Sequence, residues 1–184
     1  MSTIEPATAK IAVVPYWIEK QQFDADILRK IYRRIVDEEL DVEVFHDEPL
    51  SEDQFVEFID SGEIMASIFV HLEAGRIAGL AWLDKVEETT AVKRAAASVV
   101  VFRDFWDTTT SIEFGRIFLG HTFNVLGLDV VYGITPEPNR LSRLYIARLG
   151  FEHKATLPGF CSYKGQATDA RISMITKDQF NSKE

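Results

Sequence analysis

The sequence predicts an α+β domain with a mixed, mostly antiparallel sheet of about seven strands flanked by four helices. Short apolar runs rich in β-branched and aromatic residues are typical of buried strands, and they alternate with segments whose apolar residues recur at helical spacing. Three of these runs follow one another with only short turns between them, which favours antiparallel pairing. Elsewhere a helix separates the runs, and a helical crossover gives parallel neighbours, so the sheet should be mixed.

Size and composition exclude several classes of protein. The chain has 184 residues and is 46% hydrophobic, which fits one domain spanning residues 1–184. No segment is apolar over the ~18 residues of a membrane span, and residues 1–10 lack the apolar run of a signal peptide. The single cysteine, Cys161, excludes an internal disulfide and a cysteine-based zinc cage. A net charge of −9 argues against a nucleic-acid surface and is compatible with an amine substrate. We expect a cytoplasmic protein with no metal and with neither nucleic acid nor membrane as partner.

The elements follow the order β-α-α-β-β-β-α-β-α-β-β along the chain. The expected strands cover residues 10–17, 64–72, 76–84, 94–105, 130–134, 151–164 and 169–176. The expected helices cover residues 24–40, 51–59, 111–126 and 139–149. An edge strand tolerates Pro15 and a central strand does not, so the first strand should lie at an edge of the sheet. Ser51 and Gln54 have the spacing of a capping box at the start of the second helix, and Gly62 follows that helix as its stop.

Residues 130–151 form the most informative stretch. The β-branched and aromatic run at its start predicts a strand, and Pro136 and Pro138 end that strand because proline has no N–H to give to a ladder. Asn139 stands where a helix N-cap belongs, with its side-chain oxygen free for an amide of the first turn. Gly150 ends the helix as a residue free to adopt a positive φ.

This stretch, which ends in Leu-Gly-Phe at residues 149–151, resembles the last conserved block of the GNAT superfamily of acyl-CoA N-acyltransferases. That block is a strand followed by an Asn-headed helix that ends in Leu-Gly-Phe. The element order is also similar to the GNAT fold along nearly the whole chain. Ser142, three residues after Asn139, is closer to the branch that acetylates ribosomal-protein N-termini. The resemblance implies acetyl-CoA as the cosubstrate and direct transfer of its acetyl group to an amine.

The family binds the coenzyme A pyrophosphate on backbone amides at a helix N-terminus, where free N–H groups and the helix dipole favour anions. Counted back from Glu113, the equivalent window is residues 106–111, WDTTTS, which lacks the family's glycines and its Gln or Arg. The candidate pyrophosphate donors are the amides and hydroxyls of Thr108, Thr109, Thr110 and Ser111. The alternative is that Thr110 and Glu113 form a capping box that does no more than start the helix.

Two further parts of the cosubstrate site follow from the resemblance. Asn139 is expected to contact the pantetheine arm, and Ser142 faces the same way one turn on; the alternative is a simple N-cap and a solvated serine. A backbone N–H of the fourth strand, near Val101 or Phe102, is expected to polarise the thioester carbonyl. Such a contact stabilises negative charge where it develops in the transition state.

Tyr145 is a weak candidate for the catalytic acid. Many family members place a tyrosine in this helix to protonate the leaving thiolate, but the count from Asn139 and from Gly150 puts that tyrosine at Ile146. One residue is a rotation of roughly 100° on a helix. We therefore expect Tyr145 to pack in the core. Its expected neighbours there are Leu141, Leu144 and Leu149.

The general base must take a proton from an amine. The sequence offers three weak candidates that it does not rank, Asp84, Glu87 and His71, each of which is also explained as a surface charge or a satisfied strand residue. Cys161 is expected to be passive, because no neighbour in sequence lowers the pKa of its thiol.

The sequence thus indicates an acetyl-CoA-dependent N-acetyltransferase that acts on an amine of a small molecule or on a protein N-terminus. The alternative is a catalytically inactive GNAT-fold protein that serves in interaction or assembly, since fold does not fix function. The altered WDTTTS window supports the alternative. A homodimer is compatible with either interpretation.

Overall fold

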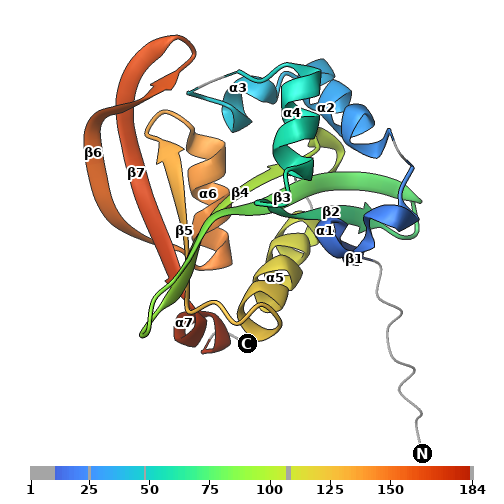
Figure 1. The fold of residues 1–184 in the computed structure, drawn as a ribbon. Coiled ribbons are helices and arrows are strands. Elements are labelled where there is room, and N and C mark those ends of the chain that lie inside the picture. Colours follow the sequence, from blue (N-terminus) through green and yellow to red (C-terminus); the bar gives the residue numbers. More distant parts are fainter. Residues whose placement is uncertain (1–10, 25, 48, 107–108, 183–184) are drawn as a thin grey trace, which may run out of the picture.

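The computed structural model describes residues 11–24, 26–47, 49–106 and 109–182, which form one seven-stranded sheet with helices on both faces (Figure 1). The strands are β1 (Ile11–Pro15), β2 (Met65–His71), β3 (Arg76–Glu88), β4 (Lys93–Val101), β5 (Val130–Pro136), β6 (Glu152–Tyr163) and β7 (Gln166–Thr176). The α-helices are α1 (Tyr16–Glu19), α2 (Ile27–Asp37), α3 (Asp41–Val44), α4 (Glu52–Asp60), α5 (Thr109–Asn124), α6 (Arg140–Leu149) and α7 (Lys177–Asn181). Two 3-10 turns, η1 (Lys20–Gln22) and η2 (Arg103–Phe105), complete the described elements.

The strand order is β1-β2-β3-β4-β5-β7-β6, with β1 at an edge, where Pro15 is tolerated. β2, β3 and β4 pair antiparallel in sequence order, as predicted. β5 runs parallel to β4, and β6 and β7 form the predicted closing hairpin, with β7 paired to β5. The mixed sheet predicted from the sequence is therefore confirmed.

The two faces of the sheet are covered by different helices. Phe69 on β2 lies opposite Gly79 and packs on Phe114 and Phe118 of α5. Trp82 points the other way, since side chains alternate along a strand, and its ring contacts Phe45 after α3 and Phe58 of α4. Helices α5 and α6 thus lie on one face and α2 to α4 on the other (Figure 1).

Local sequence signals account for the ends of several elements. The predicted capping box at Ser51 and Gln54 starts α4, and Gly150 ends α6 with a φ of 99°. β4 stops at Val101 instead of continuing to residue 105, because the chain turns into η2 there. The sequence analysis also missed α1, α3 and α7, which have four or five residues each and are too short to show a helical period.

The parallel contact between β4 and β5 is short. Its register runs from Arg94 opposite Val130 to Ala96 opposite Tyr132 and ends there. Beyond Ala96 the two strands diverge, and β5 continues with β7 alone as its partner. The closed end is held by Asp129, whose carboxylate accepts from the Lys93 amide at 2.8 Å while its own amide donates to the Lys93 carbonyl.

None of the helices in the described part of the chain is long and apolar enough to cross a membrane.

Candidate active site between the diverging strands

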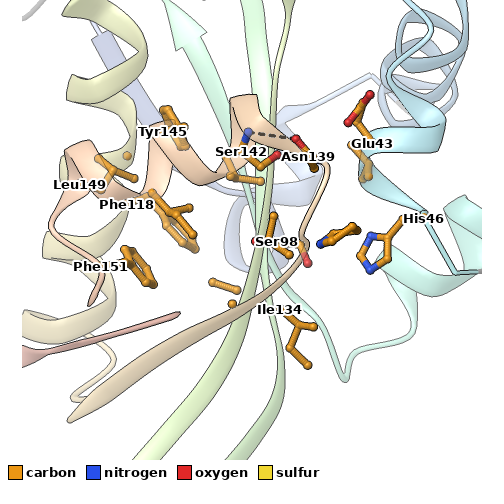
Figure 2. Close-up of a pocket in the computed structure, with 18 of the residues that line it drawn as sticks. Glu43, His46, Ser98, Phe118, Ile134, Asn139, Ser142, Tyr145, Leu149 and Phe151 are labelled. Carbon is orange, nitrogen blue, oxygen red and sulfur yellow. Dashed lines mark hydrogen bonds between the residues drawn. The ribbon is translucent and has the colours of Figure 1, made fainter. Parts of the chain in front are cut away.

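The gap between β4 and β5 opens into a groove made of two adjoining cavities of about 90 and 290 Å³. Both are lined by Val99 of β4 and by Ser142, Tyr145 and Ile146 of α6. Both cavities reach α3, at Glu43 and Val44. The smaller one lies between the strands and includes His46, and the larger one continues along α6 past Trp106 and the start of α5. Figure 2 shows Tyr145, Leu149, Phe118 and Phe151 on one side of the smaller cavity and His46 and Glu43 on the other.

The backbone of β4 presents amides to this groove. The Phe102 amide donates to the Ala78 carbonyl of β3 at 2.8 Å. In an antiparallel ladder alternate residues bond to opposite neighbours, so the N–H groups of Val101 and Val99 point away from β3 and toward β5. Two contacts support this direction: the Trp106 indole donates to the Val101 carbonyl at 2.5 Å, and the Ala97 carbonyl faces Gly133 of β5.

This geometry separates the two residues that the sequence proposed for thioester binding. Val101 lines the larger cavity and directs its amide toward the gap. The amide of Phe102 is committed to β3, and its side chain lies in the core under the Arg34 guanidinium. The Phe102 amide is therefore not free to bind a thioester, and the amide that faces the gap beside that of Val101 is the Val99 amide. The difference is one of parity, because a shift of one residue reverses the direction of every N–H along a strand.

Asn139 is the N-cap of α6 and also lines the groove. Its side-chain Oδ1 accepts from the Ser142 amide at 3.1 Å (Figure 2), which confirms the predicted N-cap. Since the cap fixes which side of the carboxamide faces the helix, Nδ2 points the other way. Asn139 is 3% exposed and lines the smaller cavity, and its Nδ2 is buried with no hydrogen-bond partner among the described residues. A buried amide donor left unpaired costs free energy, so this nitrogen is suited to a carbonyl oxygen of a ligand.

The predicted pyrophosphate donors are residues 108–111, at the start of α5, and the structure describes three of these four residues. Thr108 lies outside the described residues. Thr109 is exposed as the first residue of α5, and Ser111 is buried and lines the larger cavity. Because the helix begins at Thr109, Thr110 lies inside the first turn, and the predicted capping box of Thr110 and Glu113 is wrong.

Tyr145 is part of the groove wall and braces α6 against α5. Its hydroxyl donates to the Ser111 carbonyl at 2.9 Å, and burial raises the pKa of the phenol well above its ordinary value. Leu149 packs beside it at Gly115, as expected. The other two expected neighbours, Leu141 and Leu144, are more than half exposed, so the predicted core packing holds on one side of the ring and is wrong on the other. Ile146, at the position of the family tyrosine, lines both cavities with an apolar side chain.

The three acid–base candidates do not line either cavity. Glu87 is exposed and paired with Arg94. His71, at the end of β2, accepts from the Ala74 amide and packs against the Phe105 ring. Two strands, β3 and β4, separate β2 from β5 in the sheet. Asp84 is half-buried on the face that carries Trp82; burial raises its pKa, and its Oδ1 has no partner in the described structure.

The structure adds three polar groups that the sequence analysis did not propose. Glu43 of α3, His46 just after α3 and Ser98 of β4 line the α3 end of the smaller cavity (Figure 2). Both carboxylate oxygens of Glu43 accept from the Tyr163 hydroxyl, at 2.8 and 2.7 Å, and Lys164 lies 3.5 Å away. A helix of four residues gives no periodicity, so the sequence held no signal that α3 reaches the groove.

His46 also stands close to two side chains with metal-ligand chemistry. Potential ligand atoms of His46, Asp47 and Cys161 all lie within 4.8 Å of one another. Burial, followed by the charges of Asp47 and Asp169, raises the pKa of the Cys161 thiol, which donates to the Thr168 and Asp169 carbonyls at 3.7 and 3.8 Å. A protonated thiol engaged with carbonyls is a poor metal ligand, so hydrogen bonding explains the cluster without an ion.

No family model matches the sequence, and no curated protein matches it. Solved structures with the same fold do match. Spermidine N-acetyltransferase from Vibrio cholerae, in complex with CoA and spermine, superposes with a TM-score of 0.75 at 13% identity, over 95% of this chain and 99% of that one. RimJ of Mycobacterium smegmatis, in complex with CoA-disulfide, gives 0.72 at 14% identity, over 91% and 82%. The ribosomal-protein-S5-alanine acetyltransferase of Vibrio fischeri gives 0.71 at 11% identity, over 95% and 97%. The predicted GNAT fold is thereby confirmed.

Proposed function

We propose that this protein is an acetyl-CoA-dependent N-acetyltransferase that acts on an amine of a small molecule or on a protein N-terminus. The observation that carries the proposal is the unpaired Nδ2 of Asn139 in the gap between β4 and β5. The pantetheine arm of acetyl-CoA has amide carbonyls that match this donor. The solved structures of the same fold include spermidine and ribosomal-protein acetyltransferases, two of them bound to CoA or a CoA derivative, which supports this class of reaction.

In the proposed arrangement the cosubstrate enters along the larger cavity. Its pyrophosphate meets the first turn of α5 at Thr109 and Ser111, where the helix dipole favours an anion. Its thioester reaches the gap, where the amides of Val99 and Val101 polarise the carbonyl and stabilise the charge that develops as the amine attacks. The amine approaches from the α3 end, and the acetyl group passes directly to it.

Acetyl-CoA binding is tested by thermal unfolding. At a concentration ~100-fold above the dissociation constant, a ligand that binds only the folded state stabilises it by about 2.7 kcal/mol. For a domain of this size that gain raises the melting midpoint by roughly 5–11 °C. Asn139→Asp is the sharp variant, because aspartate is an equally good N-cap but replaces the Nδ2 donor by a carboxylate oxygen. We expect its acetyl-CoA shift to disappear, and any fall in its unliganded midpoint measures the cost of a carboxylate at this buried position.

Two further variants complete this experiment. Asn139→Ala loses the shift and also about 1 kcal/mol of stability with the cap, so its comparison with Asn139→Asp separates the two functions of the side chain. Thr109→Glu abolishes the shift, because its carboxylate occupies the place of the diphosphate at the start of α5. Wild-type protein that shows no shift at millimolar acetyl-CoA would favour the alternative, a GNAT-fold interaction protein, for which the apolar Ile146 and the glycine-free WDTTTS window are the supporting observations.

A further inference from the structure

We propose that His46 is the general base of this active site and that the acceptor amine enters at the α3 end of the groove, between His46 and Ser98. The inference rests on the proposed acetyl transfer and assigns a catalytic residue that lies outside the three candidates from the sequence.

The position of His46 carries the argument. Its side chain is 18% exposed and lines the smaller cavity, into which it points together with Ser98 in Figure 2. Nε2 lies 3.4 Å from the Asp47 carboxylate, and Nδ1 is buried with no partner among the described residues. A carboxylate beside one ring nitrogen holds the proton there, which leaves a lone pair on the other nitrogen. Nδ1 is therefore the ring nitrogen that carries the lone pair in this tautomer.

The pair is held in place from a distant part of the chain. The second oxygen of Asp47, Oδ1, accepts from the Ser162 amide of β6 at 2.6 Å. The carboxylate is thus anchored to the closing hairpin while it faces the imidazole. A base oriented by a third group is the arrangement expected of an acid–base residue, since its orientation does not have to be recovered at each turnover.

The charges around His46 leave it neutral near pH 7. Burial lowers the pKa of its imidazole below the ordinary value of 6.5, against smaller opposing effects of Asp47 and Glu43. Glu43, on α3, is itself engaged by the Tyr163 hydroxyl and approached by Lys164. Cys161, on β6, faces the pair as a protonated thiol. A neutral imidazole can accept a proton, so the protonation state suits a base.

The acceptor ammonium gives one proton to Nδ1 of His46 and becomes a neutral amine. The amine nitrogen attacks the thioester carbonyl, the new C–N bond forms and the C–S bond breaks. The proton left on the new amide nitrogen passes through solvent to the thiolate, giving CoA as a free thiol, and His46 returns its proton to bulk water. The net reaction releases one proton.

Asp84 is the rival base. It lies on the same face of the sheet as Ser98, because Trp82 pairs with Ser98 and Asp84 pairs with Ala96, one alternation further along. However, it stands on the third strand and does not line the groove, whereas His46 does. Asp84→Asn is therefore the matched comparison for His46→Gln, and His153→Gln, an exposed histidine on β6, controls for the loss of any imidazole.

The test uses spermidine and an alanine-initiated peptide as acceptor probes, with mass spectrometry of the acetylated product and the acetyl-CoA thermal shift measured in parallel. We expect His46→Gln to keep the thermal shift and to lose roughly 10²–10⁴-fold in kcat, the usual contribution of a general base. Asp84→Asn and His153→Gln should stay near wild type. In His46→Ala, added imidazole should restore part of the turnover, which a merely structural role would not allow.

The pH profile gives a second readout. A base whose pKa lies below 6.5 loses activity as the pH falls through that pKa, because the protonated ring accepts no further proton. The wild type should show this limb and His46→Gln should lack it, while the limb set by the amine itself remains in both. If His46→Gln transfers the acetyl group as well as the wild type does and with the same pH profile, the assignment of His46 as the base is overturned. The proposed acetyl transfer itself then still stands. Bound acetyl-CoA with no transfer to either probe overturns it together with the enzyme class, and absence of binding overturns the proposed function first.

Discussion

The two ends of the β4–β5 pair differ in what holds the strands together. At the closed end, three residues of β4 are in register with β5, and Asp129 clamps the Lys93 backbone through its side chain and its own amide. At the open end, the amides of Val99 and Val101 face a gap, and the strands are kept in place from behind, by β3 and by α6 packed on α5. The same two strands are hydrogen-bonded to each other at one end and, at the other, open into the groove proposed to bind acetyl-CoA.

This difference indicates which end of the groove can determine the choice of ligand. Backbone amides and a helix N-terminus present the same donors whatever side chains are attached. The open end could therefore bind the proposed cosubstrate even though this chain shares little sequence with its structural neighbours. The α3 end depends instead on particular side chains, His46, Asp47 and Glu43. Changes at the two ends should therefore have different consequences, which the following predictions examine in order of expected size.

Truncation of Tyr145 should have the largest effect, because this ring braces the open end. Tyr145→Ala removes a partly buried aromatic side chain that packs beside Leu149 and Gly115, so we expect a loss in the free energy of unfolding near the lower end of the roughly 3–5 kcal/mol typical of fully buried aromatic side chains. Tyr145→Phe removes only the hydrogen bond to Ser111 and should cost about 0.5–1.5 kcal/mol. Urea unfolding measures both. A large loss of turnover in Tyr145→Phe with unchanged stability would mean instead that the phenol takes part in catalysis.

Two glycines sharpen the contrast between the back of the open end and the gap itself. A Cβ on Gly79 of β3 would overlap the Val100 carbonyl oxygen, so Gly79→Ala forces two backbones apart and should cost about 1–3 kcal/mol. A Cβ on Gly133 of β5 meets nothing nearer than the Ala97 carbonyl at 3.6 Å. Gly133→Ala should fold normally and weaken acetyl-CoA binding, since its methyl group enters the groove. Equal stability of the two variants in urea would contradict this reading of the gap.

Arg148 should have the smallest effect. It lies at the mouth of the larger cavity on α6 and makes no ion pair with any described residue. Arg148→Ala should weaken acetyl-CoA binding roughly 2–5-fold at low salt and less at high salt, as expected of an exposed charge that attracts phosphate. Arg140→Ala, on the same helix but away from the groove, is the control. Calorimetric titrations at two salt concentrations make the comparison; equal effects of the two substitutions would remove Arg148 from the site.

The sequence predicted the parts of this site that have local causes. The N-cap at Asn139, the positive φ of Gly150 and the parallel contact of β4 with β5 all follow from residue types and element order. It could not predict the direction of the Phe102 amide, since the parity of a ladder is set by pairing with a strand more than twenty residues away. Nor could it place His46 in the groove.

His46 depends on contacts that no local pattern encodes. It follows a helix of four residues, and its orienting carboxylate is fixed by the Ser162 amide, 115 residues further along the chain from Asp47. The candidates that sequence reasoning preferred, Asp84, Glu87 and His71, were visible because they sit on long strands. The position that the structure favours lies in a connection whose course is decided by tertiary packing.

The dual use of Asn139 has an evolutionary consequence. Its oxygen serves the helix and its nitrogen faces the groove, so a substitution can spare one partner and remove the other. Asn and Asp codons differ by one nucleotide, and aspartate caps a helix as well as asparagine does. A single base change would thus keep the N-cap while it removes the proposed contact with the cosubstrate, at the cost of placing a carboxylate in a buried position. Descendants of such a chain would keep the fold and become free to drift toward purely structural duties.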